Sequence, residues 1–211
     1  MLQELAAEIE KTASAVVRDI HTALPGKIVS FDPEKSVAVV QPKGKYRTEE
    51  GAALDYPVIP DVPVLFPYCQ ASGVGVAFPV KPDDNCLIVV SEIELDEWRT
   101  GAESEAPLRF DLTSAIAIPG LMSSGNASVQ KAVKENAVVL KAENVEMVVS
   151  DGKASVRTGG VEMTVSGDGV SVKGNLKVSG NVIAGNDVWG GRVSLRGHRH
   201  SGVHGETSAG H

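Results

Sequence analysis

Several residue types that would define a protein class are scarce in this 211-residue sequence. The two cysteines, Cys69 and Cys86, follow no metal-binding spacing, and we expect buried free thiols of an intracellular protein. The formal net charge of −7 argues against a nucleic-acid partner, because phosphate binding needs a basic surface. No apolar run approaches the ~18 residues of a membrane-spanning helix. The acidic start MLQELAAEIEK is unlike a signal peptide, so classical export is not expected.

Proline and aromatic residues are almost missing from the second half of the chain. All 11 prolines lie at or before Pro119, and Trp189 is the one aromatic residue after residue 121. The last 90 residues instead hold 15 of the 22 glycines. A change of composition this large indicates a domain boundary within residues 121–126.

The first segment, residues 1–24, predicts a helix that ends at the sequence LPG. Its apolar residues recur every three or four positions, as one face of a helix requires. Periodicity does not name the surface that this face covers: the helix either lies on its own domain or docks on a partner or on copies of itself. The apolar residues are Leu2, Leu5, Ala6, Ile9, Ala13, Val16, Val17 and Ile20.

Residues 25–121 predict a small β-barrel. Short β-rich runs alternate with turn sequences such as DPEK and KPDDN. About five strands in so short a region suit a closed barrel such as an OB-fold. The runs are KIVSFD, SVAVVQP, YPVIPDVPVLFP, VGVAFPV and NCLIVVSEI.

The region that follows, residues 122–196, is expected to be one short strand after another, with no helix to cover them. Val, Leu, Ile or Met alternate with polar residues between turns such as SDGK and SGDG. A ribbon this thin cannot bury enough apolar surface alone to offset ~1–2 kcal/mol of backbone entropy per residue. Three copies wound round a common axis would bury each apolar face, so we favour an intertwined trimer. A single-chain β-solenoid or sandwich is the alternative.

Four of the five histidines lie in the last fifteen residues, GHRHSGVHGETSAGH. If the last strand continues through VSLRGHRH, His198 and His200 project from the same face. Three chains would then bring six imidazoles together, and six nitrogen ligands suit an octahedral first-row transition metal. His204 is a further candidate ligand, while His204 and His211 are otherwise expected to be solvated or to pack. The competing interpretation is a disordered solvated tail.

The order of these features resembles the central membrane-piercing spike of contractile phage tails and R-type bacteriocins. The closest cues are GHRHSGV at residues 197–203 and the style of GDGVSVKGNLKVSGNVIAG. PDDNCLIVVSEIELDEW and SAIAIPGL are similar to the barrel region of such spikes.

The resemblance implies an all-β fold: an N-terminal helix and small OB-fold barrel, then an intertwined trimeric β-helix ending in a metal-bound tip at residues 197–211. It implies a homotrimer that contacts baseplate hub and tail tube proteins and the outer membrane of the target cell. One iron ion per trimer, on the three-fold axis, would be held by His198 and His200. The protein would be made in the host cytoplasm and assembled at the tail tip of a virion or bacteriocin.

No enzyme is expected, because the acidic residues Asp151, Asp168 and Asp187 all sit in turn-like sequences. The alternative function is a trimeric tail-fibre or adhesin tip that binds a cell-surface receptor. Such tips usually expose aromatic and polar loops, whereas this tail offers mainly Gly, Ser and His.

Overall fold

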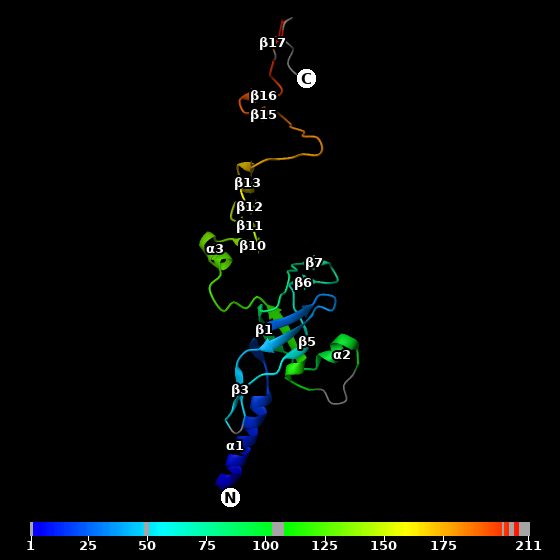
Figure 1. The fold of residues 1–211 in the computed structure, drawn as a ribbon, viewed down its shortest axis with the longest axis vertical. Helices are drawn as coiled ribbons and strands as arrows, with labels where there is room; N and C mark the ends of the chain where they lie inside the picture. Colours follow the sequence, from blue (N-terminus) through cyan, green and yellow to red (C-terminus); the bar gives the residue numbers. More distant parts are fainter. Residues whose placement is uncertain (1, 49–50, 103–107, 200, 203–204, 207–211) are drawn as a thin grey trace. The chain divides into compact units, whose positions relative to one another are not determined.

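A computed structural model describes residues 2–48, 51–102, 108–199, 201–202 and 205–206 (Figure 1). The chain divides into two compact units, Met1–Asn126 and Ala127–His211. None of the described helices combines the length and the apolar character needed to cross a bilayer.

The predicted N-terminal helix is confirmed as α1 (Leu2–Asp19). Thr12 donates its hydroxyl hydrogen to the Glu8 carbonyl oxygen one turn earlier, at 2.9 Å. Wherever burial is described in α1, the side chains are exposed, apart from the half-buried Ala15. The helix therefore does not bury its apolar stripe within its own unit.

The first unit is built round a five-stranded antiparallel sheet with the order β5-β2-β1-β8-β9. Strand β1 pairs with β8 through its first half and with β2 through its second, and its register with β2 shifts between Ile28 and Ser30. Such a shift bends a strand and increases its twist. The strands are β1 (Ala23–Asp32), β2 (Val37–Pro42), β5 (Ile59–Pro63), β8 (Asn85–Val90) and β9 (Ala115–Pro119).

This sheet curls until its two edge strands approach each other. Val64, just after β5, forms a parallel bridge with Ala117 of β9. The backbone N–H of Leu65 donates to the Ala117 carbonyl oxygen at 2.8 Å. The sheet is therefore a five-stranded half-barrel, which agrees with the predicted barrel in its coarse form.

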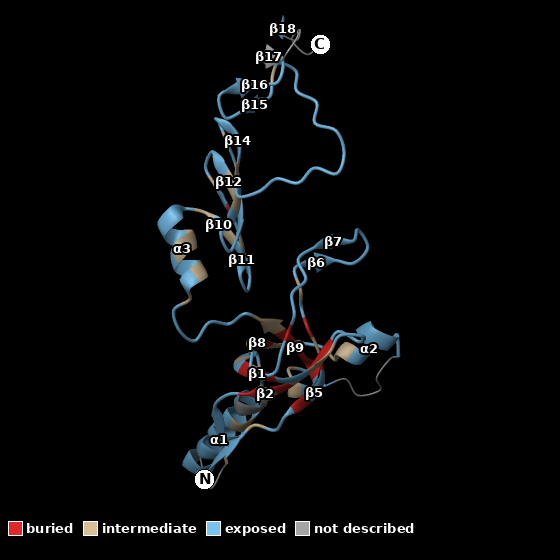
Figure 2. Ribbon diagram, turned by 45° about the horizontal axis from the view of Figure 1, so that its top comes forward, coloured by how far each residue is buried: buried red, intermediate tan, exposed pale blue. Residues whose placement is uncertain are grey.

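The interior of the half-barrel holds most of the buried side chains of the chain (Figure 2). Ile28, Val40, Ile88 and Cys86 are at most 2% exposed. Gly26 allows the close approach of β1 and β8, because a Cβ there would lie 2.5 Å from the Ile88 Cδ1 atom.

Smaller elements of this unit depart from the sequence prediction. The run at residues 74–80 forms a strand only over its first two residues, and a short helix interrupts the expected all-β region. That helix ends at Gly101, whose φ of 73° is accessible to glycine without strain. Cys69 is exposed rather than buried, because it lies in a peripheral hairpin. The elements are β3 (Lys45–Arg47), β4 (Ala53–Asp55), β6 (Tyr68–Cys69), β7 (Val74–Gly75), α2 (Leu95–Thr100) and a 3-10 helix (Leu112–Ser114).

The second unit contains a helix, α3 (Ala127–Glu135), and a five-stranded antiparallel meander in sequence order. The helix contradicts the expectation of strands alone. The meander forms from five consecutive strands of one chain. Within the described residues of one chain, the strands of this unit form this meander and two short hairpins. The intertwined β-helix predicted over residues 122–196 needs three chains and stays a prediction. The strands are β10 (Val138–Ala142), β11 (Val145–Ser150), β12 (Lys153–Thr158), β13 (Val161–Ser166), β14 (Gly169–Lys173), β15 (Trp189–Gly190), β16 (Val193–Ser194), β17 (Ser201–Gly202) and β18 (Gly205–Glu206).

Candidate functional site

Apolar side chains cover one face of the meander in the second unit, and we call this side the apolar face. Directly paired residues on neighbouring strands share a face, so Leu140, Met147, Val156, Met163 and Val172 form one row across it. Parallel rows complete the apolar face with Val138, Ala142, Val145, Val149, Ala154, Val161, Val165 and Val170.

Most of the apolar face is exposed in the single chain. Met147 is 38% exposed, Val156 42% and Met163 49%. Val148, which points to the opposite face of the same sheet, is only 8% exposed. In most sheets the face with the larger apolar residues is buried, whereas in this single chain that face is exposed to water. An exposed apolar patch of this extent marks an interaction surface.

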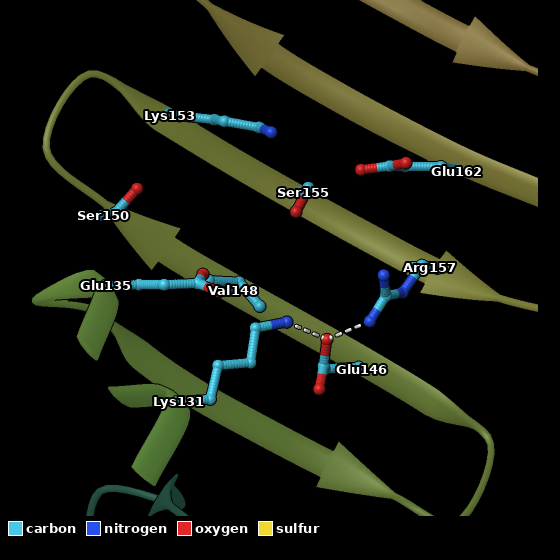
Figure 3. A pocket seen from close by; sticks show the side chains of 9 residues that line it. All are labelled: Lys131, Glu135, Glu146, Val148, Ser150, Lys153, Ser155, Arg157 and Glu162. Atoms are coloured by element: carbon cyan, nitrogen blue, oxygen red, sulfur yellow. Dashed lines mark hydrogen bonds and ion pairs between the residues drawn. The ribbon is translucent and has the colours of Figure 1, made fainter. Parts of the chain in front are cut away.

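The opposite, polar face is covered in part by α3 through an ion triad. Lys131 of α3 and Arg157 of β12 both donate to Oε1 of Glu146 on β11, the second at 2.7 Å (Figure 3). The Glu146 side chain is 14% exposed. The hydrogen bond from Lys131 lowers the pKa of Glu146 below its ordinary value, and the nearby positive charges of Lys131, Arg157 and Lys141 act in the same direction.

Charge in the pocket beneath α3 is balanced. The pocket has a volume of about 190 Å³, and its lining includes three basic and three acidic side chains. The triad therefore fastens α3 to the sheet rather than leaving a charge for a ligand. Sequence reasoning missed this helix, although Val129, Ala132 and Val133 recur at helical spacing after Asn126, a residue type favoured at N-caps. The basic residues are Lys131, Lys153 and Arg157, and the acidic residues are Glu135, Glu146 and Glu162.

A turn, rather than a continuing strand, leads to the first of the candidate metal ligands. Strand β16 ends at Ser194, and residues 195–197 form a turn in which the backbone N–H of His198 donates to the Ser194 carbonyl oxygen at 3.1 Å. The Ser194 hydroxyl oxygen accepts from the backbone N–H of Gly197 at 2.8 Å. Such local bonds compete with a strand ladder, which explains why the expected extended path fails here.

Asp187 also stabilises this turn, through a hydrogen bond from the backbone of Arg196. Its Oδ1 atom accepts backbone hydrogen bonds from Val188 at 2.7 Å and Arg196 at 3.1 Å. A hydrogen bond from the Ser194 hydroxyl is the main cause that lowers the pKa of Asp187, and the two backbone bonds add to it. Asp151 and Asp168 lie in the turns that join β11 to β12 and β13 to β14. Asp151 and Asp168 therefore sit in turns, as expected, whereas Asp187 lies in an irregular segment just before β15.

The half-buried His198 ring contacts the backbone of the turn that precedes it. Its Nδ1 atom lies 2.9 Å from the Leu195 carbonyl oxygen and 3.2 Å from that of Ser194. A carbonyl oxygen only accepts, so these contacts are hydrogen bonds when Nδ1 carries the ring proton. Metal-binding histidines commonly have this arrangement.

The other candidate ligands, His200 and His204, lie outside the described residues, as does His211. Among the residues that are described, no three His, Cys, Asp or Glu side chains gather closely enough to hold a metal ion. Within that part, one chain brings together no complete site, and the role of His198 as a metal ligand stays a prediction.

Cys86 is a buried titratable group of the half-barrel. Burial raises the pKa of its thiol to about 11, so the thiol stays protonated and unreactive near neutral pH.

The half-barrel region is similar to a known protein family. Residues 24–120 match the family model of the phage protein Gp138 N-terminal domain. No curated protein matches the chain.

Proposed function

We propose, on the premise that residues 24–120 match a phage protein domain, that the chain is a trimeric spike at the baseplate of a contractile injection device. It would puncture the outer membrane of the target cell mechanically. The observation that carries this proposal is the exposed apolar face of the meander, which needs partners of the same kind to be stable in water.

Three copies related by a three-fold axis satisfy that need. The α3 helix of the same chain lies on the polar face and leaves the apolar face open. Closed rotational symmetry brings identical faces together round one axis and gives them a common interior. Aligned meanders with paired strands also suit a part that must resist load, because few strand edges stay open.

The segment after the meander supports an intertwined β-helix closer to the tip. Residues 175–188 lie outside the strands of the single chain, and Leu176, Val182 and Ile183 are 73%, 66% and 92% exposed. Apolar residues at such exposure lack an interior of their own. Winding three such segments together would bury them and supply the missing strand partners.

The half-barrel supports an OB-fold that would seat the spike in the baseplate hub, next to the tail tube. The strand order β5-β2-β1-β8-β9 and the parallel bridge between Val64, just after β5, and Ala117 of β9 support this part of the proposal. Its buried core is made of its own residues, so it would give a rigid base.

A metal ion would pin the three chain ends. His198 and His200 from each chain would hold one iron ion, with His204 as a further candidate, and the ion would supply a cross-link rather than chemistry on a substrate. The Nδ1 contacts of His198 with the Leu195 and Ser194 carbonyl oxygens support this, because metal-binding histidines commonly make such a contact through the ring nitrogen that does not bind the metal. The protein would act in a virion or bacteriocin tail tip after synthesis in the host cytoplasm.

Light scattering on the purified full chain tests the proposal. We expect the mass of three chains at micromolar concentration, resistance of the trimer to detergent, and one metal ion per trimer by elemental analysis. A monomeric mass would overturn the proposal. Saturable binding to whole target cells, competed by unlabelled protein, would favour the receptor-binding tip instead.

A further inference from the structure

The apolar stripe of the first helix, α1, has a stricter pattern than one helical face requires. Ala6, Ile9, Ala13 and Val16 follow one another at spacings of three and four residues. Leu2 and Ile20 extend the same alternation at either end. This is the a/d repeat of a coiled coil, in which each heptad places two apolar residues on one seam.

The stripe meets water in the single chain. Ile9 is 61% exposed and Val16 58%, and the flanking Leu5 and Val17 are 57% and 67% exposed. An isolated helix of this length is marginal in water, so packing of the stripe against a partner is the main source of stability open to it. Its own half-barrel does not provide that packing.

Charge along the helix permits a second copy of the same helix as the partner. With Ala6 and Ala13 at position a, the charged residues Glu4 and Lys11 fall at position f, which faces outward in a coiled coil. In a parallel bundle each g residue faces the e residue five positions later on its neighbour. The pairs are then Leu5 with Glu10, and Thr12 with Val17, so no like charges oppose each other.

We infer that α1 of each chain packs against α1 of the other two copies as a parallel three-helix coiled coil. This inference rests on the proposed trimer, whose three-fold symmetry would make the helices parallel and in register. Linkage to an assembled trimer raises the effective concentration of the helices, so a short coiled coil forms where free peptides would not. A lipid surface fits less well, since the polar side lacks the Lys and Arg richness of membrane-bound helices.

Site-specific cross-linking of the full chain tests this inference. Ile9→Cys places a thiol at the seam and Lys11→Cys places one on the outer side, both in a Cys69→Ser background that removes the exposed native thiol. A short bismaleimide should join Ile9→Cys chains into covalent dimers, up to two of every three chains, and should leave Lys11→Cys chains largely unjoined. Ile9→Lys should increase hydrogen exchange of the α1 amides, although Lys has the better helix propensity.

The outcomes separate this inference from the proposed function. A trimeric mass with equal cross-linking of the two cysteine variants, or with α1 exchange unchanged by Ile9→Lys, overturns the coiled coil and leaves the spike intact. A monomeric mass for the unmodified chain overturns both. Protection of α1 that appears only with added lipid vesicles also overturns the coiled coil.

Discussion

Replacing Val156 by Asp places a charge at the centre of the apolar face. Val156 lies on the middle strand of the meander and pairs directly with Met147 and Met163. Because it is exposed in the single chain, the change removes little from the folded monomer. In the proposed trimer, by contrast, it removes apolar burial from three chains and introduces three carboxylates.

The magnitude follows from the exposed fraction. Complete burial of a Val side chain is worth about 1.5–3 kcal/mol, and Val156 has 42% of its surface left to bury, or about 0.6–1.3 kcal/mol per chain. Three chains lose about 2–4 kcal/mol, which weakens trimer formation roughly 30-fold to several hundred-fold. Each carboxylate that loses water without a partner adds a penalty of several kcal/mol, so the loss for Val156→Asp is larger.

Light scattering across a dilution series measures this loss. Val156→Ala should shift the trimer to dissociation at higher concentration, and Val156→Asp should yield monomers at micromolar concentration. Ser171→Asp, on the polar face of the same sheet, is the matched control and should remain trimeric. A stable Val156→Asp trimer, or equal dissociation of the control, would refute the assignment of the apolar face to the trimer interior.

Three further predictions concern the tip, the α3 triad and the half-barrel core. His198→Ala combined with His200→Ala should remove the bound metal by elemental analysis while the mass stays trimeric; retention of one metal ion per trimer would show that other residues bind it. The pKa of Glu146 is lowered in the folded chain, so the triad contributes its full stabilisation of α3 at any pH above the ordinary Glu pKa of ~4.3. This stabilisation is lost as the pH falls through the lowered pKa. Hydrogen exchange in α3 should rise in that window, and Glu146→Gln should abolish the pH dependence; an unchanged profile in the variant contradicts this role. Ile88→Ala should destabilise the half-barrel by about 2–5 kcal/mol in denaturant unfolding, since Ile88 is fully buried; a change below about 1 kcal/mol would mean that the core collapses round the gap.

Local sequence patterns predicted the elements whose stability depends on near neighbours. The three-and-four spacing of apolar residues predicted α1, and alternation predicted most strands of the half-barrel and the meander. The turns around Asp151 and Asp168 followed from turn chemistry alone. These features need only a few consecutive residues, so the sequence determined them without reference to the fold.

Tertiary structure alone decided the features that join distant residues. The edge contact between Val64 and Ala117 depends on how far the sheet curls, and α3 is short enough to need Glu146 and Arg157 beside Lys131. The turn before His198 results from backbone hydrogen bonds to the side chains of Ser194 and Asp187, which replace the bonds of a strand ladder. The alternation of apolar and polar residues gives no sign of these bonds. Alternation identified an apolar face in the meander, but only the placement of α3 on the other side left that face open.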